Sequence, residues 1–104
     1  MPGVANTVQT RHPDRNKSMP RVARPAYEAI RHAILQVVPR TVAGIAFKDL
    51  PRRVAALLPA DARSQIGSIP WYTTVVKLDL EARGVIERVP GVLPQRVRRS
   101  RHRT

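Results

Sequence analysis

Prolines divide this chain into short segments, and their positions limit which elements can form. Pro25 and Pro70 each open a run of apolar residues at helical spacing. A proline is tolerated there because the first N–H groups of a helix have no intrahelical partner. Pro39 and Pro59 each follow such a run and end it. The sequence therefore predicts several short elements.

Apolar residues at helical spacing predict three helices, at about residues 25–38, 49–58 and 70–83. Gly84 follows the third helix at the position where a residue with a left-handed backbone conformation, usually glycine, commonly ends a helix. Gly84 therefore marks the predicted end of the third helix.

The remaining segments predict strands and loops. A brief strand is expected at Ile45–Ala46, a loop at residues 59–69, and a β-hairpin around Pro90 and Gly91. The order helix, strand, helix, helix, strand, strand is that of a winged helix-turn-helix domain. The sequence thus predicts an α+β fold in which the hairpin is the wing and the third helix is the recognition helix.

The stretches AYEAIRHAILQVVP and WYTTVVKLDLEARGVIERV resemble a family of small uncharacterised bacterial proteins, a domain of unknown function that is winged-helix-like. The resemblance covers roughly residues 25–98 and is most specific in the aromatic pair followed by VVKLDLEARGVI. It implies a fold and no activity. One departure is the segment 59–69, which is longer than the tight turn between the second and third helices of DNA-reading winged helices.

Charge is concentrated at the two ends of the chain, whose net charge is +12. Residues 1–24 hold five basic side chains and one acidic, and residues 25–94 hold nine and six. The last ten residues hold five arginines and no acid. Basic ends on a compact module indicate a polyanionic partner, with nucleic acid as the first candidate.

Three parts of the chain are expected from these patterns. Residues 1–24 form an extended basic arm, with one short strand around Val4–Val8. Residues 25–98 form the winged-helix domain, and residues 99–104 form a disordered basic tail.

A helical projection of the third helix predicts which side chains face a partner. Thr73, Thr74 and Lys77 lie on the polar arc, and the neighbouring Tyr72 can reach solvent or phosphate through its hydroxyl. Trp71 lies in the apolar arc and is expected in the core. Arginines of the last strand and the tail add contacts to the DNA backbone. The predicted DNA-binding residues are Tyr72, Thr73, Thr74, Lys77, Arg96, Arg98, Arg99 and Arg101.

Asp79 interrupts the apolar arc of the third helix, which makes a structural role more plausible than a catalytic one. A carboxylate buried without a partner would cost several kcal/mol, on the order of the penalty for one unpaired ion. Arg83, one turn later, is the expected partner. Arg88 and a backbone N–H of the N-terminal arm are the alternatives. We expect Asp79 to fix how a strand or arm docks on the helix.

Nothing in the sequence predicts catalysis, and neither a cofactor nor a small-molecule substrate is expected. There is no Gly-rich phosphate loop, nucleophile elbow or paired-carboxylate pattern. His12, His32 and His102 lie in separate regions, so no metal site is expected. The absence of cysteine fits a reducing compartment, and no apolar run approaches the roughly 20 residues of a membrane helix.

The leading hypothesis is a winged-helix protein of an accessory or transcription-regulatory kind that binds duplex DNA and is not an enzyme. It would be cytoplasmic and associated with the nucleoid. Two alternatives stay open. The first is a module for protein–protein contact or homodimerisation through the wide apolar arc of the third helix. The second is a basic protein associated with RNA or the ribosome. A membrane partner is not expected, because the arms lack an amphipathic helix.

Overall fold

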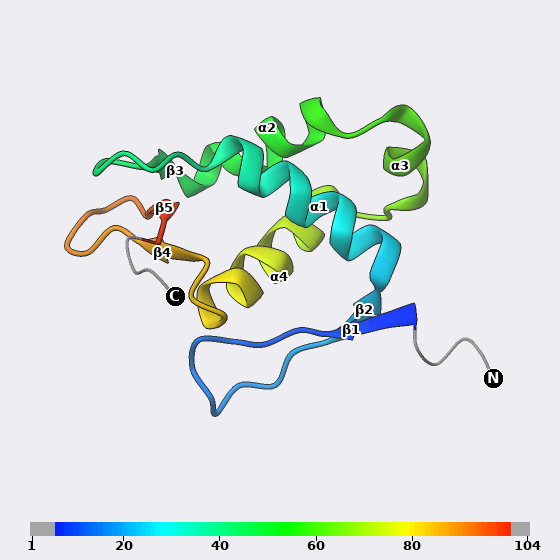
Figure 1. Ribbon diagram of the computed structural model, residues 1–104, viewed down its shortest axis with the longest axis horizontal. Coiled ribbons are helices and arrows are strands. Elements are labelled where there is room, and N and C mark those ends of the chain that lie inside the picture. Colours follow the sequence, from blue (N-terminus) through cyan, green and yellow to red (C-terminus); the bar gives the residue numbers. More distant parts are fainter. Residues whose placement is uncertain (1–5, 101–104) are drawn as a thin grey trace.

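The structure is a computed structural model that describes residues 6–100, and it has an α+β architecture with two small antiparallel sheets (Figure 1). The helices are α1 (Arg24–Val37), α2 (Leu50–Leu57), α3 (Ala60–Gln65) and α4 (Ile69–Ala82), and the 3₁₀ turn η2 (Phe47–Asp49) leads into α2. The strands are β1 (Thr7–Gln9), β2 (Arg21–Ala23), β3 (Ile45–Ala46), β4 (Ile86–Arg88) and β5 (Arg96–Arg99).

Helix α4 forms the centre of the molecule and packs against α1, α2 and β4. Ser68 caps its start, because the side-chain oxygen accepts from the backbone N–H of Trp71 at 3.2 Å. Its end is followed by Gly84, which has a positive φ of 77°. Between these limits, Val76 and Leu80 are fully buried, so α4 supplies a large part of the core.

The second sheet has the strand order β3–β5–β4. Val97 of β5 is fully buried and pairs with Ile45 on one side and Arg88 on the other. Gly44 allows β3 to approach β5 closely: it has a φ of +66°, and a Cβ atom there would lie 2.2 Å from the carbonyl oxygen of Val97. Residues 89–95 form the β4–β5 loop.

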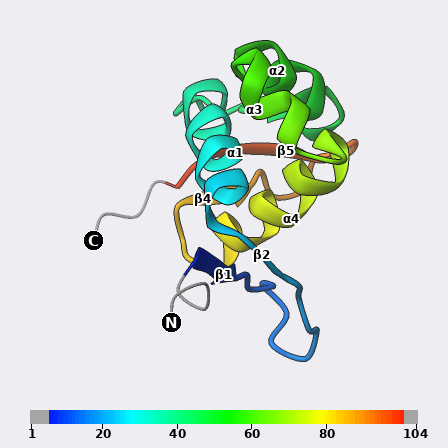
Figure 2. The same ribbon diagram turned by 90° about the vertical axis from the view of Figure 1, so that its right-hand side faces the viewer.

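Strands β1 and β2 form an N-terminal hairpin whose inner side chains, Val8 and Val22, face each other in register and are buried. The hairpin packs against α1. Its connection, residues 10–20, is called the hairpin loop below; it projects beyond the helices in both views (Figures 1 and 2). The N-terminal segment thus contributes to the core.

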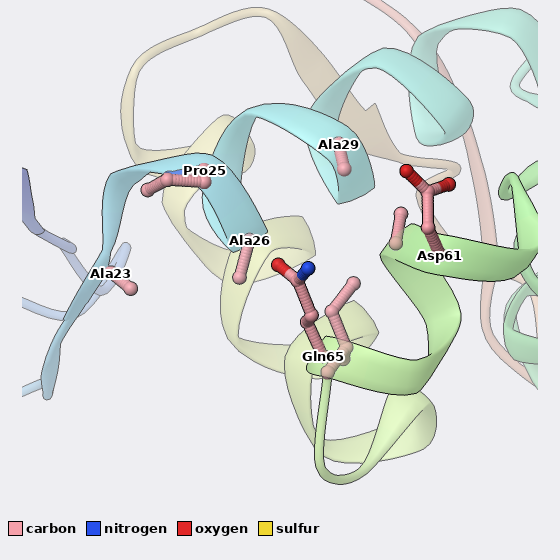
Figure 3. A pocket seen from close by; sticks show the side chains of 8 residues that line it. Ala23, Pro25, Ala26, Ala29, Asp61 and Gln65 are labelled. Carbon is pink, nitrogen blue, oxygen red and sulfur yellow. The ribbon is translucent and has the colours of Figure 1, made fainter.

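Helix α3 lies beside the first turns of α1 and leaves an open pocket of about 260 Å³ between them. Figure 3 shows Asp61 and Gln65 of α3 on one side and the small side chains Ala26 and Ala29 of α1 on the other. The wall is mostly alanine and proline, and we assign no chemistry to it.

Several predicted elements are confirmed. The three helices are present as α1, α2 and α4, the strand Ile45–Ala46 is β3, and a β-hairpin follows α4. The last strand begins at Arg96, later than the apolar stretch suggested.

Two expectations about irregular segments need correction. Residues 59–69 are not only a loop, because they contain α3. The N-terminal arm forms two paired strands where one unpaired strand was expected. The strand predicted around Val4–Val8 overlaps β1 at Thr7 and Val8, and its first two residues lie outside the described part of the chain.

Candidate nucleic-acid interface

Two of the residues predicted to face DNA, Thr73 and Lys77, are buried, with 0% and 3% of their surface exposed. The prediction of an exposed arc at these positions is therefore wrong. A helical projection assumes that one side of a helix faces solvent, whereas α4 is covered by helices on one flank and by the second sheet on the other. The Thr73 hydroxyl has no hydrogen-bond partner among the described residues.

Lys77 is held by three groups beneath the β4–β5 loop. Its Nζ lies 3.0 Å from Glu81 Oε2, donates to Gln95 Oε1 and stands 4.8 Å from the centre of the Phe47 ring. Burial lowers the pKa of Lys77, and the charge of Glu81 opposes that effect. Lys77 therefore joins α4 to the base of the β4–β5 loop and is not available to a partner.

Beyond its first residues, α4 is exposed along a narrow strip formed by Trp71, Thr74 and Leu78, which we call the α4 strip. Thr74 is exposed as predicted, and Leu78 is half-buried. The prediction that Trp71 lies in the core is wrong, because 47% of its surface is exposed. Tyr72 is half-buried and packs edge-on against the Trp71 ring, with 5.1 Å between ring centroids. The α4 strip thus offers one hydroxyl between two apolar side chains.

Asp79 is fully buried and accepts hydrogen bonds from three elements. Arg83 Nε donates to its Oδ2 at 2.8 Å, so the predicted pair is confirmed. The backbone N–H of Arg11, in the hairpin loop, donates to Oδ1 at 2.8 Å. The Tyr27 hydroxyl of α1 also donates to Oδ2. Sequence analysis missed Tyr27 as a partner; the available signal was a phenol hydroxyl within the apolar stripe of α1.

Burial and the hydrogen bond to Asp79 raise the pKa of Tyr27 to about 12, from an ordinary value of 10.0. Below pH 10 the phenol is neutral in both the folded and the unfolded chain, so its contribution to stability is complete. Between pH 10 and 12 the unfolded chain loses the phenol proton first, and stability falls as the pH rises.

We expect this loss to disappear in a Tyr27→Phe variant. From pH 10 to 12, the free energy of unfolding of the unsubstituted protein should fall by about 2 kcal/mol more than that of the variant. Urea unfolding of both proteins across this range measures the difference, and lysine titration cancels because both chains share it. Parallel curves would show that Tyr27 does not keep its proton in the folded state.

Two loops flank the α4 strip. Lys77 and Asp79 lie on opposite sides of the strip, because successive helical residues are about 100° apart. Asp79 holds the hairpin loop at Arg11 on one side, and Lys77 holds the β4–β5 loop at Gln95 on the other. Figures 1 and 2 show α4 between the N-terminal hairpin and the second sheet. The α4 strip therefore lies between the hairpin loop and the β4–β5 loop.

Cations lie in the hairpin loop and at the start of the β4–β5 loop. An open pocket of about 440 Å³ in the hairpin loop is lined by the exposed side chains of Arg11, Arg15 and Lys17 together with His12. On the other side, Arg88 at the end of β4 is near enough to Lys77 to contribute to lowering its pKa, after the larger effect of burial. Positive charge therefore borders the α4 strip on two sides.

The predicted arginines of β5 make contacts within the fold. Arg96 donates to the carbonyl oxygens of Ala43 and Gly44 at 2.8 and 3.1 Å. Arg98 donates to Glu87 at 2.6 Å and to the Val42 carbonyl at 2.9 Å. Through these hydrogen bonds, the two guanidinium groups attach the segment before β3 to strand β5.

Arg99, the last predicted arginine that the structure describes, donates to the Leu35 carbonyl of α1. The structure does not bring the β5 arginines together with the α4 strip. Arg101, also a predicted contact, lies outside the described residues.

A family model, described as a family of unknown function (DUF6958), matches residues 7–97. The chain belongs to this family. The match begins in β1 and ends in β5, so it includes the N-terminal hairpin and extends beyond the segment 25–98 on which the resemblance was first seen. No curated protein and no solved structure matches the chain.

The charge of this DUF6958 chain is only partly compensated within the fold. Two of its 19 basic residues lie at positions 101–104, which leaves 17 in the described part, together with all seven acidic residues. Five of the seven acids form an ion pair with a basic side chain. Within residues 6–100, 12 basic side chains therefore have no acidic partner.

Neither a metal site nor a membrane-spanning helix is found among residues 6–100. Between residues 6 and 100, no three His, Asp or Glu side chains come close enough together to hold a metal ion. No helix in that same part is long and apolar enough to cross a membrane.

Proposed function

We propose that this chain is a winged-helix module that binds duplex DNA in an accessory or regulatory role. The element order α1, β3, α2, α4, β4, β5 supports the fold assignment, as does the sheet order β3–β5–β4. In this arrangement the β4–β5 loop is the wing and α4 is the recognition helix. The additional helix α3 occupies the connection between α2 and α4.

The observation that carries the proposal is the α4 strip, which lies between the hairpin loop with its three cations and the β4–β5 loop with Arg88 at its start. A B-DNA major groove admits one α-helix, and the flanking phosphates then lie on both sides of it. We assign Arg15 and Lys17 of the hairpin loop and Arg88 beside the wing to these phosphates, because all three are exposed cations at the two loops. Thr74 is the side chain on the strip that can bond to a base edge, and Trp71 and Leu78 can contact thymine methyl groups or sugars.

The proposal predicts strongly salt-dependent binding to a random DNA duplex. Each neutralised phosphate releases counterions, so four such contacts would weaken binding roughly a hundredfold between 50 and 200 mM salt. Fluorescence anisotropy with a labelled duplex of about 16 base pairs, roughly one and a half turns, measures this slope. Weak binding at low salt, or a slope near zero, would contradict the proposal.

A matched pair of variants shows whether the charge must lie beside the α4 strip. Arg15→Gln/Lys17→Gln should reduce the salt slope by about two, because each cation meets one phosphate. Arg53→Gln/Arg63→Gln removes the same charge from exposed positions on α2 and α3, and should leave the slope nearly unchanged. An unlabelled RNA duplex serves as competitor, and preferential displacement by RNA would indicate an RNA-binding protein instead.

A second candidate function is protein–protein contact through the same surface. It is favoured by the exposure of large apolar side chains, 47% for Trp71 on the strip and 85% for Leu93 in the wing. Sedimentation at micromolar concentration separates the two candidates. A monomer that binds duplex supports the first, whereas self-association that blocks the duplex supports the second.

A further inference from the structure

An open pocket of about 430 Å³ lies on the α1 side of the N-terminal hairpin, away from the α4 strip. It is formed by β1, the first two turns of α1 and the residue that follows α4. Three arginines line it: Arg24, Arg31 and Arg83. We call it the arginine pocket.

Two of these guanidinium groups are held by neighbouring carbonyls of β1. Arg24 Nη2 donates to the Thr7 carbonyl at 3.0 Å, and Arg83 Nη2 donates to the Gln9 carbonyl at 3.3 Å. Carbonyls two residues apart on a strand point to the same edge and are separated by about 7 Å. The two cations are thereby fixed side by side, and each keeps further N–H groups for a ligand.

The third guanidinium, that of Arg31, makes no hydrogen bond or ion pair with any residue between positions 6 and 100. Arg99 approaches the same helix, where it donates to the Leu35 carbonyl one turn beyond Arg31. Burial, together with the charges of Arg40 and Arg31, lowers the pKa of Arg99. Arg31 thus has a full set of five donors for a ligand.

Fewer acidic than basic side chains lie at the arginine pocket. Glu28 lines the pocket at 3.9 Å from Arg24, and more than half of its side chain is exposed. Asp79 is buried below and already bonded to Arg83 and Tyr27. The three arginines of the pocket therefore stand against two carboxylates, which leaves a net charge of about +1 at the pocket.

We propose that the arginine pocket binds a phosphate group. Planar guanidinium donors match phosphate oxygens in pairs, and donors that are already fixed lose less freedom on binding. A cavity of this size accommodates a phosphate with a small organic group attached. Arg83 also connects the pocket to Asp79, so a bound phosphate would strengthen the attachment of β1 to the helices. This site uses none of the residues of the α4 strip and goes beyond the DNA-binding function.

The test is an NMR titration of the full chain with inorganic phosphate, with ionic strength held constant by sodium chloride. Saturable shifts are expected at the backbone amides of Thr7, Gln9 and Arg24. Arg31→Gln should weaken phosphate binding roughly tenfold or more, the usual effect of losing a charge-assisted contact. Glu28→Gln, which removes the pocket's own carboxylate, should tighten it.

Arg53→Gln is the control, since it removes one exposed positive charge from α2. It should leave phosphate binding unchanged. Shifts that do not saturate, or equal weakening by Arg31→Gln and Arg53→Gln, would overturn the proposal, because both indicate general charge screening.

A final arm identifies the source of the phosphate. If a short DNA duplex displaces inorganic phosphate from the pocket, the ligand is a nucleic-acid backbone. If the duplex binds and leaves the pocket signals unchanged, the ligand is a free phosphate compound, and the pocket assignment holds in either case. Should the duplex fail to bind at all, the DNA-binding function fails while the phosphate titration still decides the pocket.

Discussion

An Asp79→Asn substitution is expected to lower the free energy of unfolding by about 3–5 kcal/mol, the range for breaking a buried ion pair. Asp79 is fully buried and accepts from Arg83, Tyr27 and the backbone of Arg11. Asparagine has the same shape, yet it carries no charge, and its amide nitrogen cannot accept any of these donors. Donors left unpaired in the interior account for the loss.

Urea denaturation followed by circular dichroism measures this change. Asp61→Asn is the matched control, because Asp61 is exposed on α3 and forms no ion pair with the described residues. The control should change stability by less than about 0.5 kcal/mol. A similar small change for Asp79→Asn would show that Asp79 does not hold the hairpin to α4. Retained stability with lost ligand binding would instead return Asp79 to the functional residues.

Replacing Lys77 with methionine should cost a similar amount, about 3–5 kcal/mol. The side chains of Lys77 and Glu81 are 4% and 7% exposed. Methionine fills much of the lysine volume, but it leaves the Glu81 carboxylate buried without a cation. The cost therefore comes mainly from Glu81.

The double variant Lys77→Met/Glu81→Leu separates the charge effect from packing. It should recover most of the stability, because a buried pair replaced by apolar residues of similar volume is often neutral or stabilising. Under the proposed function, the double variant should also bind duplex DNA with the affinity of the unsubstituted chain. A single Lys77→Met variant of unchanged stability that no longer binds DNA would place Lys77 in the interface and contradict its assigned role.

Local patterns in the sequence were sufficient to predict most helices and one ion pair. Proline positions and helical spacing located α1, α2 and α4, since both depend on residues near in sequence. The contact between Asp79 and Arg83 follows from a spacing of four residues. The docking of the arm through a backbone N–H was also anticipated, and Arg11 supplies that group.

Features that depend on several elements at once could not be predicted in the same way. Thr73 and Lys77 are polar, yet both are buried, and Lys77 is covered by residues remote in sequence, Gln95 of the β4–β5 loop and Phe47 of η2. Trp71 is apolar, yet no element covers it. Strand β2 has three residues and pairs with a strand 14 positions earlier, which leaves little local signal.

Asp79 connects the stability of the fold to the proposed interface. By accepting from the Arg11 backbone, it attaches the hairpin loop, which carries Arg15 and Lys17, to α4. Lys77 does the same for the wing through Gln95. Lys77, predicted as a DNA contact, and Asp79, predicted as a structural residue, thus both attach to α4 the loops that the proposed function assigns to DNA.

Amide-shift mapping of the full chain with and without a short DNA duplex tests the central claim most directly. The proposed function predicts the largest changes at Thr74, at the Trp71 indole, in the hairpin loop from Arg15 to Lys17, and in the wing. Thr73 and Lys77 should change less than these exposed neighbours. Changes confined to α2 and α3, or an α4 strip and hairpin loop that do not respond to saturating duplex, would contradict it.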